Sequence, residues 1–296
     1  MLNCYICLFR FIQFCTSMQK LKYLLILGLC INLNAFSQKA PETKSGWLLG
    51  TQAYTFRLFT LDDALRKTDS CGLKNIEIYG GQTIGGGIDG KVDFKMSAEN
   101  RQKLKNLFKK YGISVNAFGV INAKDEAEWI QLFEFAKDLG IKVINTEPQP
   151  AQFAYLIPLA EKYKIKLGIH NHPKPSRYWH PDSVAKYIGN SPYVGACIDL
   201  GHYVRSGIDP IEAMKSLEGR IVSFHFKDVV PSPQAGKYHD VVWGGGQSKV
   251  DEAIAEMKRQ KFKGPISAEY EHNWENSAPE VAQSAAYFRE AYKRIK

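Results

Sequence analysis

Four side chains spaced along the chain could together hold a divalent cation. They are Glu147, Asp199, His225 and Glu269. Each stands at the end of an apolar run typical of a buried strand, as residues 194–199 illustrate. Three carboxylates and one imidazole form an oxygen-rich set that suits Mn²⁺, Co²⁺ or Mg²⁺, with Zn²⁺ as a further candidate. Because buried carboxylates without a counter-ion are costly, one divalent ion is the simplest compensation. Alternatively, these residues cap helices or pair with Lys166 and Lys227.

Other polar and aromatic side chains could move protons or contact a substrate. The candidates for catalysis are Glu147, Glu269, His172, His202 and Lys227, and those for substrate contact are Tyr54, Glu77, His170 and Trp243. Histidine suits proton transfer because its pKa lies near neutrality and shifts either way. Tyr54 and Trp243 could pack against the faces of a sugar, although packing in the core or a loop would explain them equally well. A hydrogen bond to a neighbouring loop is the alternative for His172.

These residues need a scaffold that gathers strand ends, and the pattern of the chain predicts one. Eight candidate strands begin near Leu48, Asn75, Ile113, Ile141, Ile165, Val194, Ile221 and Pro265. Helical patterns lie between and after them, at residues 61–70, 97–111, 125–139, 153–163, 181–188, 209–217, 250–260 and 278–295. Alternating strands and helices indicate parallel strands with crossover helices, and eight units fit an α/β fold with a single closed (β/α)8 TIM barrel. A doubly wound open sheet is the alternative.

Strand parity places polar residues inside this barrel, because successive side chains of a strand face opposite sides. The inward positions near the strand ends include His170, His172, His225, Lys227, Glu269 and Glu271. Two long loops follow the second and seventh strands, at residues 80–90 and 230–246, on the face where barrel enzymes keep their active sites. Their glycines match no phosphate-binding motif, so we expect flexible lids there.

The N-terminus has the pattern of a targeting signal. Two lysines precede the apolar run at residues 23–31, and a small-residue cleavage site follows at Ala35–Ser37. We therefore predict a cleavable signal peptide at residues 1–37, for which Met18 is a better start than Met1. The apolar run is short for a bilayer span, so we expect no stable membrane insertion after cleavage and a periplasmic or secreted protein.

The remaining chain is predicted to be a short linker, residues 38–46, followed by one barrel over residues 47–296. The formal charge of +9 is not concentrated in a long run of lysine and arginine, which argues against a nucleic-acid partner. Four of the six cysteines precede residue 31, leaving Cys71 and Cys197. Two distant cysteines in a large domain argue against a disulfide framework.

With these residues in order, the chain resembles the xylose isomerase-like barrels, which include sugar isomerases, ketose 3-epimerases, inosose dehydratases and apurinic endonucleases. The resemblance covers residues 48–292 and rests on Cys197-Ile-Asp-Leu-Gly-His202, His225-Phe-Lys-Asp228 and Gly264-Pro-Ile-Ser-Ala-Glu-Tyr-Glu271. The match implies one divalent metal at the four residues above and a substrate contact at His202. His170-Asn-His172 is more similar to inosose dehydratases than to epimerases.

We therefore expect an exported, metal-dependent enzyme that removes a proton next to a carbonyl of a keto-sugar or related carbohydrate. It would be an isomerase or epimerase, or a hydro-lyase such as a 3-keto-sugar derivative hydratase. An apurinic endonuclease-like phosphodiesterase and a non-catalytic sugar-binding barrel are the alternatives. The expected partner is a small carbohydrate, and a homo-oligomer would be compatible with such families.

Overall fold

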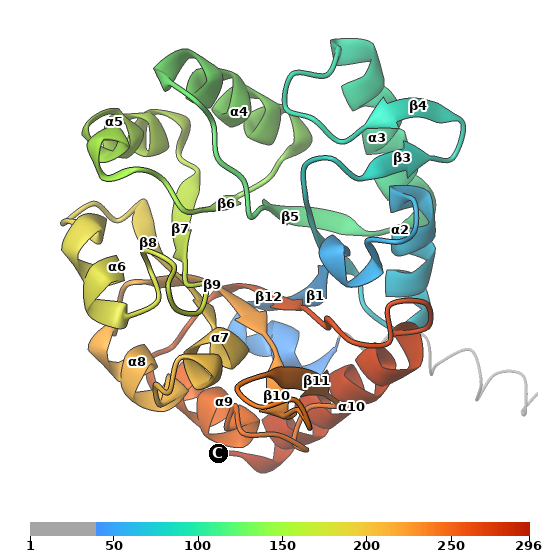
Figure 1. Ribbon diagram of the computed structural model, residues 1–296. Helices are drawn as coiled ribbons and strands as arrows, with labels where there is room; N and C mark the ends of the chain where they lie inside the picture. The colour runs from blue at the N-terminus through green and yellow to red at the C-terminus, as the bar shows by residue number, and fades with distance from the viewer. Residues whose placement is uncertain (1–39) are drawn as a thin grey trace, which may run out of the picture. The chain divides into compact units, whose positions relative to one another are not determined.

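Eight parallel strands close into one barrel with helices on its outside (Figure 1). The computed structural model describes residues 40–296, of which Pro41–Lys296 form one compact unit. The barrel strands are β1 (Trp47–Gln52), β2 (Asn75–Ile78), β5 (Ser114–Phe118), β6 (Val143–Thr146), β7 (Lys166–His170), β8 (Val194–Asp199), β9 (Ile221–Phe226) and β12 (Gly264–Ala268). Because β1 pairs with both β2 and β12, the sheet has no open edge, and the doubly wound alternative is excluded.

The helices follow the predicted ranges closely because local end signals fix them. They are α2 (Leu61–Ser70), α3 (Ala98–Tyr111), α4 (Glu126–Leu139), α5 (Phe153–Tyr163), α6 (Pro181–Ile188), α8 (Pro210–Ser216), α9 (Val250–Arg259) and α10 (Ala278–Arg294). Ser97 and Asp125 accept hydrogen bonds from backbone N–H groups in the first turns of α3 and α4. Gly112 and Gly140 end the same helices in the left-handed conformation, which glycine adopts without steric cost.

The alternation of the strands divides the molecule into an apolar outer layer and a polar interior. Phe226 of β9 packs edge-on against Phe288 of α10, with ring centroids 5.6 Å apart. Burying such a ring stabilises the fold by about 1.5–3 kcal/mol. Inside the barrel, Ser223 donates to Asn145 at 2.7 Å and Ser267 donates to Glu77 at 2.8 Å. The barrel interior below the strand ends therefore contains hydrogen-bonded polar side chains as well as apolar ones.

The two long loops are more regular than the flexible lids that we expected. The first contains the antiparallel pair β3 (Thr83–Gly85) and β4 (Ile88–Lys91), and the second contains β10 (Asp228–Pro231) and β11 (Tyr238–Val241). The carboxylate of Asp228 accepts hydrogen bonds from the backbone N–H groups of Gly244, Gly246 and Ser248 at 2.8–2.9 Å. A Cβ on Gly246 would lie only 2.3 Å from that carboxylate. The glycines of this loop therefore let its backbone approach the Asp228 carboxylate closely.

Shorter helices complete the fold. They are η2 (Pro41–Ser45), η3 (Ala53–Phe56), η4 (Pro150–Gln152) and α7 (Leu200–Arg205). The segment expected to be a linker thus contains η2, which holds a buried Glu42 paired with Arg289 of α10 at 3.2 Å. The predicted signal peptide, residues 1–37, lies outside the described residues. Within residues 40–296, no helix is long and apolar enough to cross a membrane.

Candidate functional site

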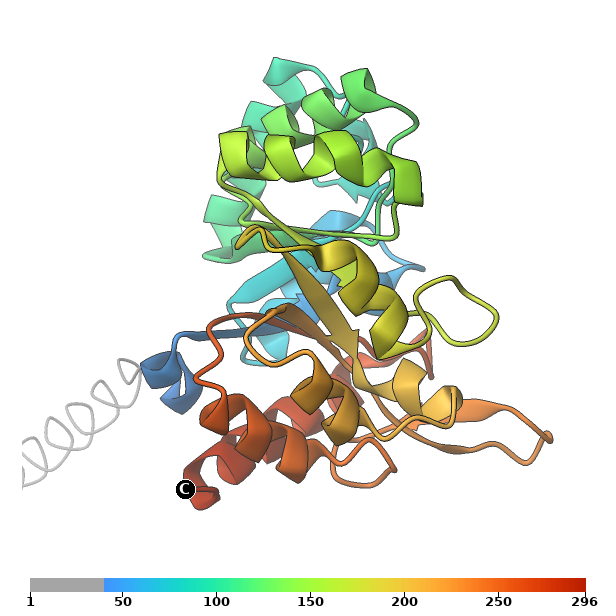
Figure 2. The same ribbon diagram turned by 90° about the vertical axis from the view of Figure 1, so that its left-hand side faces the viewer.

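A cavity of about 370 Å³ opens where the carboxyl ends of the barrel strands meet. Its wall includes Tyr54, Tyr79, His170, His172, Lys227 and Glu269. Figure 2 shows the orange β10–β11 pair and the yellow-green segment after β7 projecting from the same end of the barrel. The predicted convergence of polar strand ends on one cavity is therefore what the fold produces.

Four buried side chains converge beside this cavity with ligand atoms that lie within 4.8 Å of one another. They are His170, Asp199, His225 and Glu269. One atom of each, Nε2, Oδ2, Nδ1 and Oε2 respectively, is buried without a hydrogen-bond partner among the described residues. His225 Nδ1 lies 2.8 Å from Glu269 Oε2, and His170 Nε2 lies 3.7 Å from Asp199 Oδ2. Two carboxylates and two imidazoles that converge in this way fit a divalent cation.

Carboxylates hold the far side of both histidine rings. His225 Nε2 donates to Glu77 Oε2 at 3.0 Å, and His170 Nδ1 donates to Glu147 Oε1 at 3.0 Å. Such contacts fix the orientation and tautomer of a metal-binding imidazole and leave its other nitrogen free for the ion. Both rings thus already point one nitrogen toward the space between the four ligand atoms.

The predicted ligand set contained Glu147 rather than His170, and the structure places Glu147 beside His170, in a neighbouring group of candidate ligands. Glu147 follows the last residue of β6, and its backbone N–H donates to Asn122 at 3.2 Å. Its carboxylate turns toward His170 and His172, and it joins these two histidines in a separate group of candidate metal ligands. Burial alone would raise the pKa of Glu147, but hydrogen bonds from the two histidines lower it to about 2.

Lys227 supplies positive charge inside the site. Its Nζ lies 3.3 Å from Asp199, 3.2 Å from Glu269 and 2.7 Å from Glu271. Burial would lower the pKa of Lys227, but these carboxylates raise it well above the ordinary value. The alternative in which Lys227 pairs with the carboxylates is therefore present in the structure of the metal-free chain.

His202 occupies the space between Asp199 and Lys227. Its backbone N–H donates to Asp199 Oδ1 at 2.8 Å, so the Asp199 carboxylate also caps the N-terminus of α7. Its Nε2 lies 3.3 Å from Lys227 Nζ. Burial, reinforced by the charge of Lys227, lowers the pKa of His202 well below its ordinary value despite Asp199. The ring is therefore neutral near pH 7 and acts as a hydrogen-bonding group.

A second polar layer beyond Lys227 was missed by the sequence analysis. Arg205 of α7 pairs with Asp240 of β11 at 2.5 Å and lies 3.4 Å from Glu271. Asp240 also accepts from the backbone N–H of Glu271 at 2.7 Å. Glu271 lines the cavity, as its predicted inward parity implies. Arg205 and Asp240 lie on elements that the pattern did not predict.

The predicted substrate contacts divide into three placements. Tyr54 and His170 line the cavity, as expected. Glu77 is 1% exposed and lies beneath the site as the partner of His225 and Ser267. Trp243 is wrong as a substrate contact, because it is buried in the core against Phe226 and Phe288, with ring centroids at 5.3 and 5.8 Å.

Comparison with known proteins places this geometry in a family. The model of the xylose isomerase-like TIM barrel family matches residues 65–291. The chain belongs to that family. The same chain is 33% identical to an uncharacterised protein from Parabacteroides distasonis ATCC 8503 of known structure, with 82% of this chain and 98% of that one covered and a TM-score of 0.67. Comparison with curated proteins found no match to the chain.

Two more distant structures share the fold. A D-tagatose 3-epimerase-like protein is 17% identical, with 83% of this chain and 97% of that one covered and a TM-score of 0.65. The IOLI protein with a bound zinc atom is 20% identical, with 84% and 99% covered and a TM-score of 0.64. At these identities the likeness concerns the fold.

Proposed function

We propose that this protein is a divalent-metal-dependent enzyme that removes a proton next to a carbonyl of a keto-sugar or related carbohydrate. The observation that carries the proposal is the set of four buried ligand atoms of His170, Asp199, His225 and Glu269, which lie within 4.8 Å of one another beside a small-molecule cavity. Membership of a family with sugar isomerases and epimerases, and a zinc-containing protein of the same fold, support it.

The residues divide the chemistry in a simple way. A divalent ion held by the four residues would polarise a substrate carbonyl or hydroxyl oxygen. His172 lines the cavity and contacts the Glu147 carboxylate through Nδ1. That contact orients the ring and leaves Nε2 to take a proton from carbon or give one to oxygen. Lys227 Nζ, held by Glu271, donates a hydrogen bond to a substrate oxygen.

The cavity wall opposite the charged residues favours a sugar-sized substrate. Tyr54 and Tyr79 pack edge-to-face with ring centroids 5.2 Å apart and line the cavity together. A cavity of about 370 Å³ lies at the small end of the range for ligand pockets. We infer a compact polar ligand that sets one apolar face against the two tyrosines and its oxygens toward Lys227 and Glu269.

Isomerase or epimerase and hydro-lyase activity share the proton abstraction and differ in its second half. Incubation of the protein with a 3-keto-sugar or its unsaturated derivative in D₂O separates them. Deuterium incorporation with an inverted or relocated carbonyl indicates an epimerase or isomerase, whereas gain or loss of water indicates a hydro-lyase. Absence of exchange on all keto-sugars tried, or full activity after exhaustive chelation, would refute the proposal.

A phosphodiesterase of the apurinic endonuclease kind is the second candidate. One observation favours it: Glu147, His170 and His172 form a further group of candidate metal ligands, and such an enzyme needs several ions. Metal analysis of the purified protein discriminates the two. One ion per chain supports the sugar enzyme, whereas two or three ions with cleavage of abasic DNA would support the nuclease. A sugar-binding barrel without catalysis would bind the keto-sugar in D₂O and exchange no proton.

We also propose that the protein is exported, with a mature N-terminus near Gln38, and works in the periplasm or outside the cell. The basic and apolar pattern of residues 20–37 supports this location. Sequencing of the N-terminus from a fractionated culture tests it, and a cytosolic product that retains Met18 would overturn it. The same preparation, run on a calibrated sizing column, tests the expected homo-oligomer.

A further inference from the structure

Cys197 lies next to the proposed metal site and shares His170 and His225 with it in a separate group of candidate ligands. It precedes Asp199 by two positions on β8 and therefore faces the barrel interior as Asp199 does. The strand register pairs Cys197 directly with His170 of β7. The side chain is fully buried, and its Sγ lies within 4.8 Å of ring nitrogens of both His170 and His225.

Each of the two histidines can offer a ring nitrogen to an ion shared with Cys197. His170 Nε2 and His225 Nδ1 are buried without hydrogen-bond partners among residues 40–296, while carboxylates hold the other nitrogen of each ring. Cys197, His170 and His225 form a group of three candidate ligands, which would leave the fourth position of a tetrahedral ion open, as in catalytic zinc sites. Thiolate and imidazole together select zinc-like ions, whereas carboxylates alone suit Mn²⁺ and Mg²⁺.

We propose that Cys197 is a metal ligand and that the site therefore selects a thiophilic divalent ion, of the zinc type, over Mn²⁺ and Mg²⁺. The inference rests on the metal-dependent function proposed above and corrects its expected ion preference. On binding, the S–H bond of Cys197 breaks, the sulfur forms a bond to the ion, and the proton passes to solvent. No oxidant or reductant takes part.

Cobalt(II) is the probe, because a cobalt–thiolate bond gives a charge-transfer band in the near ultraviolet. The experiment uses the full chain with the four cysteines of residues 1–30 replaced by serine, loaded with one equivalent of Co²⁺. We expect the band in this protein and its loss in Cys197→Ser. Cys71→Ser is the matched control, since Cys71 is also buried but donates to the Ala278 carbonyl at 3.3 Å outside the site. It should keep the band.

Affinities give a second measure. Cys197→Ser should lose at least about 10-fold in Zn²⁺ affinity, the lower bound seen when supporting groups of a metal site are removed, and should keep its Mn²⁺ affinity. If Cys197→Ser fails to fold, X-ray absorption of the zinc-loaded protein replaces it. A sulfur shell at about 2.3 Å supports the proposal, and a shell of only nitrogen and oxygen at about 2.0–2.1 Å overturns it.

The outcomes separate this inference from the proposed function. Bound Co²⁺ without a charge-transfer band, or an unchanged Zn²⁺ affinity in Cys197→Ser, overturns the role of Cys197 and leaves a metal-dependent enzyme intact. Failure of the unsubstituted chain to bind any of Co²⁺, Zn²⁺ or Mn²⁺ overturns both.

Discussion

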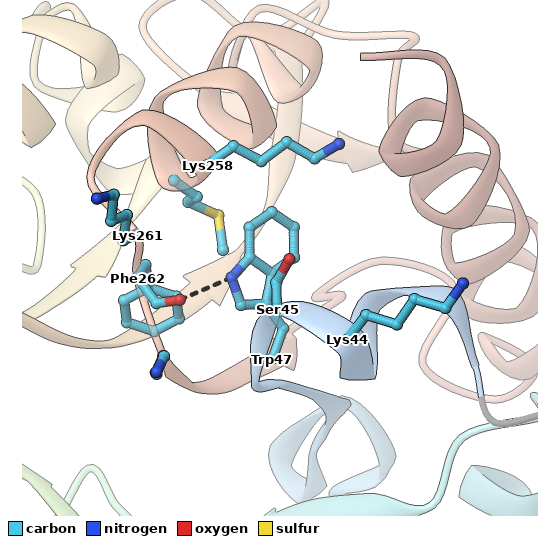
Figure 3. A pocket seen from close by; sticks show the side chains of 8 residues that line it. Lys44, Ser45, Trp47, Lys258, Lys261 and Phe262 are labelled. Atoms are coloured by element: carbon cyan, nitrogen blue, oxygen red, sulfur yellow. Dashed lines mark hydrogen bonds between the residues drawn. The ribbon is translucent and has the colours of Figure 1, made fainter. Parts of the chain in front are cut away.

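The two ends of the barrel each carry a cavity, and the two cavities differ in chemistry more than in size. The cavity at the amino ends of the strands measures about 310 Å³, against about 370 Å³ at the carboxyl ends. It is ringed by Lys44, Lys258, Lys261 and Lys263 around Trp47 (Figure 3). The indole N–H donates to the Phe262 carbonyl at 2.9 Å, and Lys258 donates to the Tyr292 carbonyl at 2.6 Å.

The two cavities differ in how their polar groups are satisfied, and this difference separates a candidate reactive site from an ordinary surface cavity. At the amino end the buried indole and Lys258 donate to backbone carbonyls, and the other three lysines are exposed to solvent. At the carboxyl end, charged groups are buried, and four ligand atoms have no hydrogen-bond partner among the described residues. Such an arrangement costs stability and persists when it serves chemistry. We therefore expect substitutions at the two ends to have unequal effects.

The largest effect should come from Glu269→Gln. The amide keeps the shape but removes the charge that faces His225 and Lys227, so we expect kcat to fall on the order of 100-fold or more with the fold retained. Turnover and metal content are the measurements. The matched control is Glu275→Gln, at an exposed position on the loop after β12, which should leave turnover and metal content unchanged. Equal turnover in the two variants would contradict the role of Glu269 in the site.

His172→Ala should have the next largest effect and sharpen the division of roles within the site. His172 is outside the four-atom set, so the variant should keep its metal but lose on the order of 100-fold in kcat, typical of a lost general acid or base. Metal analysis and steady-state kinetics check this. His272→Ala, at an exposed histidine outside the cavity lining, is the control. Loss of metal in His172→Ala would make His172 a ligand instead.

A moderate effect is expected on the pH dependence of stability of the metal-free protein. Burial would lower the pKa of His170, but Asp199 and Glu147 raise it from 6.5 to about 9, while the pKa of Glu147 falls from 4.5 to about 2. The His170 contribution is present below pH 6.5 and is lost as pH rises toward 9. The Glu147 contribution is present above pH 4.5 and is lost as pH falls toward 2.

The free energy of unfolding should therefore decline on both sides of the interval between pH 4.5 and 6.5. Urea unfolding of the chelator-treated protein across pH measures it. In His170→Gln the alkaline decline should become shallower, because one of the groups that bind a proton more tightly in the folded state is gone. An unchanged alkaline slope in this variant would contradict the buried charge pairing of His170.

The smallest effect belongs to the amino end. Lys261→Ser removes an exposed charge from the rim of that cavity, so activity should be unchanged and the free energy of unfolding should move by no more than about 0.5 kcal/mol. Kinetics and urea unfolding are the checks. A large loss of turnover would show that the second cavity takes part in function and would break the comparison.

Much of the fold could be predicted because its signals are local. Strand parity placed His225, Lys227 and Glu269 inside the barrel, and Gly112 and Gly140 marked helix ends. Each of these inferences depends on spacing within one element. The closed barrel then followed from the number and order of such elements, and the pairing of β1 with β12 confirms it.

The structure departs from the expected placements at side chains whose direction is set after the strand ends. Glu147 lies in the turn beyond β6, where parity no longer applies, and the two histidines of β7 and its loop attract its carboxylate. Trp243 follows β11, and its ring turns into the core because large aromatic rings there gain more by burial than in the cavity wall. The Arg205–Asp240 pair joins two elements far apart in sequence, which no local pattern reveals.

The Asp228 carboxylate, which accepts hydrogen bonds from three loop N–H groups, also makes the opening of residues 244–248 measurable. Amide protons in an exposed loop ordinarily exchange with solvent deuterium at once, whereas those of Gly244, Gly246 and Ser248 are held by a buried acceptor and exchange only when the segment detaches. The exchange lifetime of these three protons thus reports how often residues 244–248 detach from Asp228, independently of any substrate.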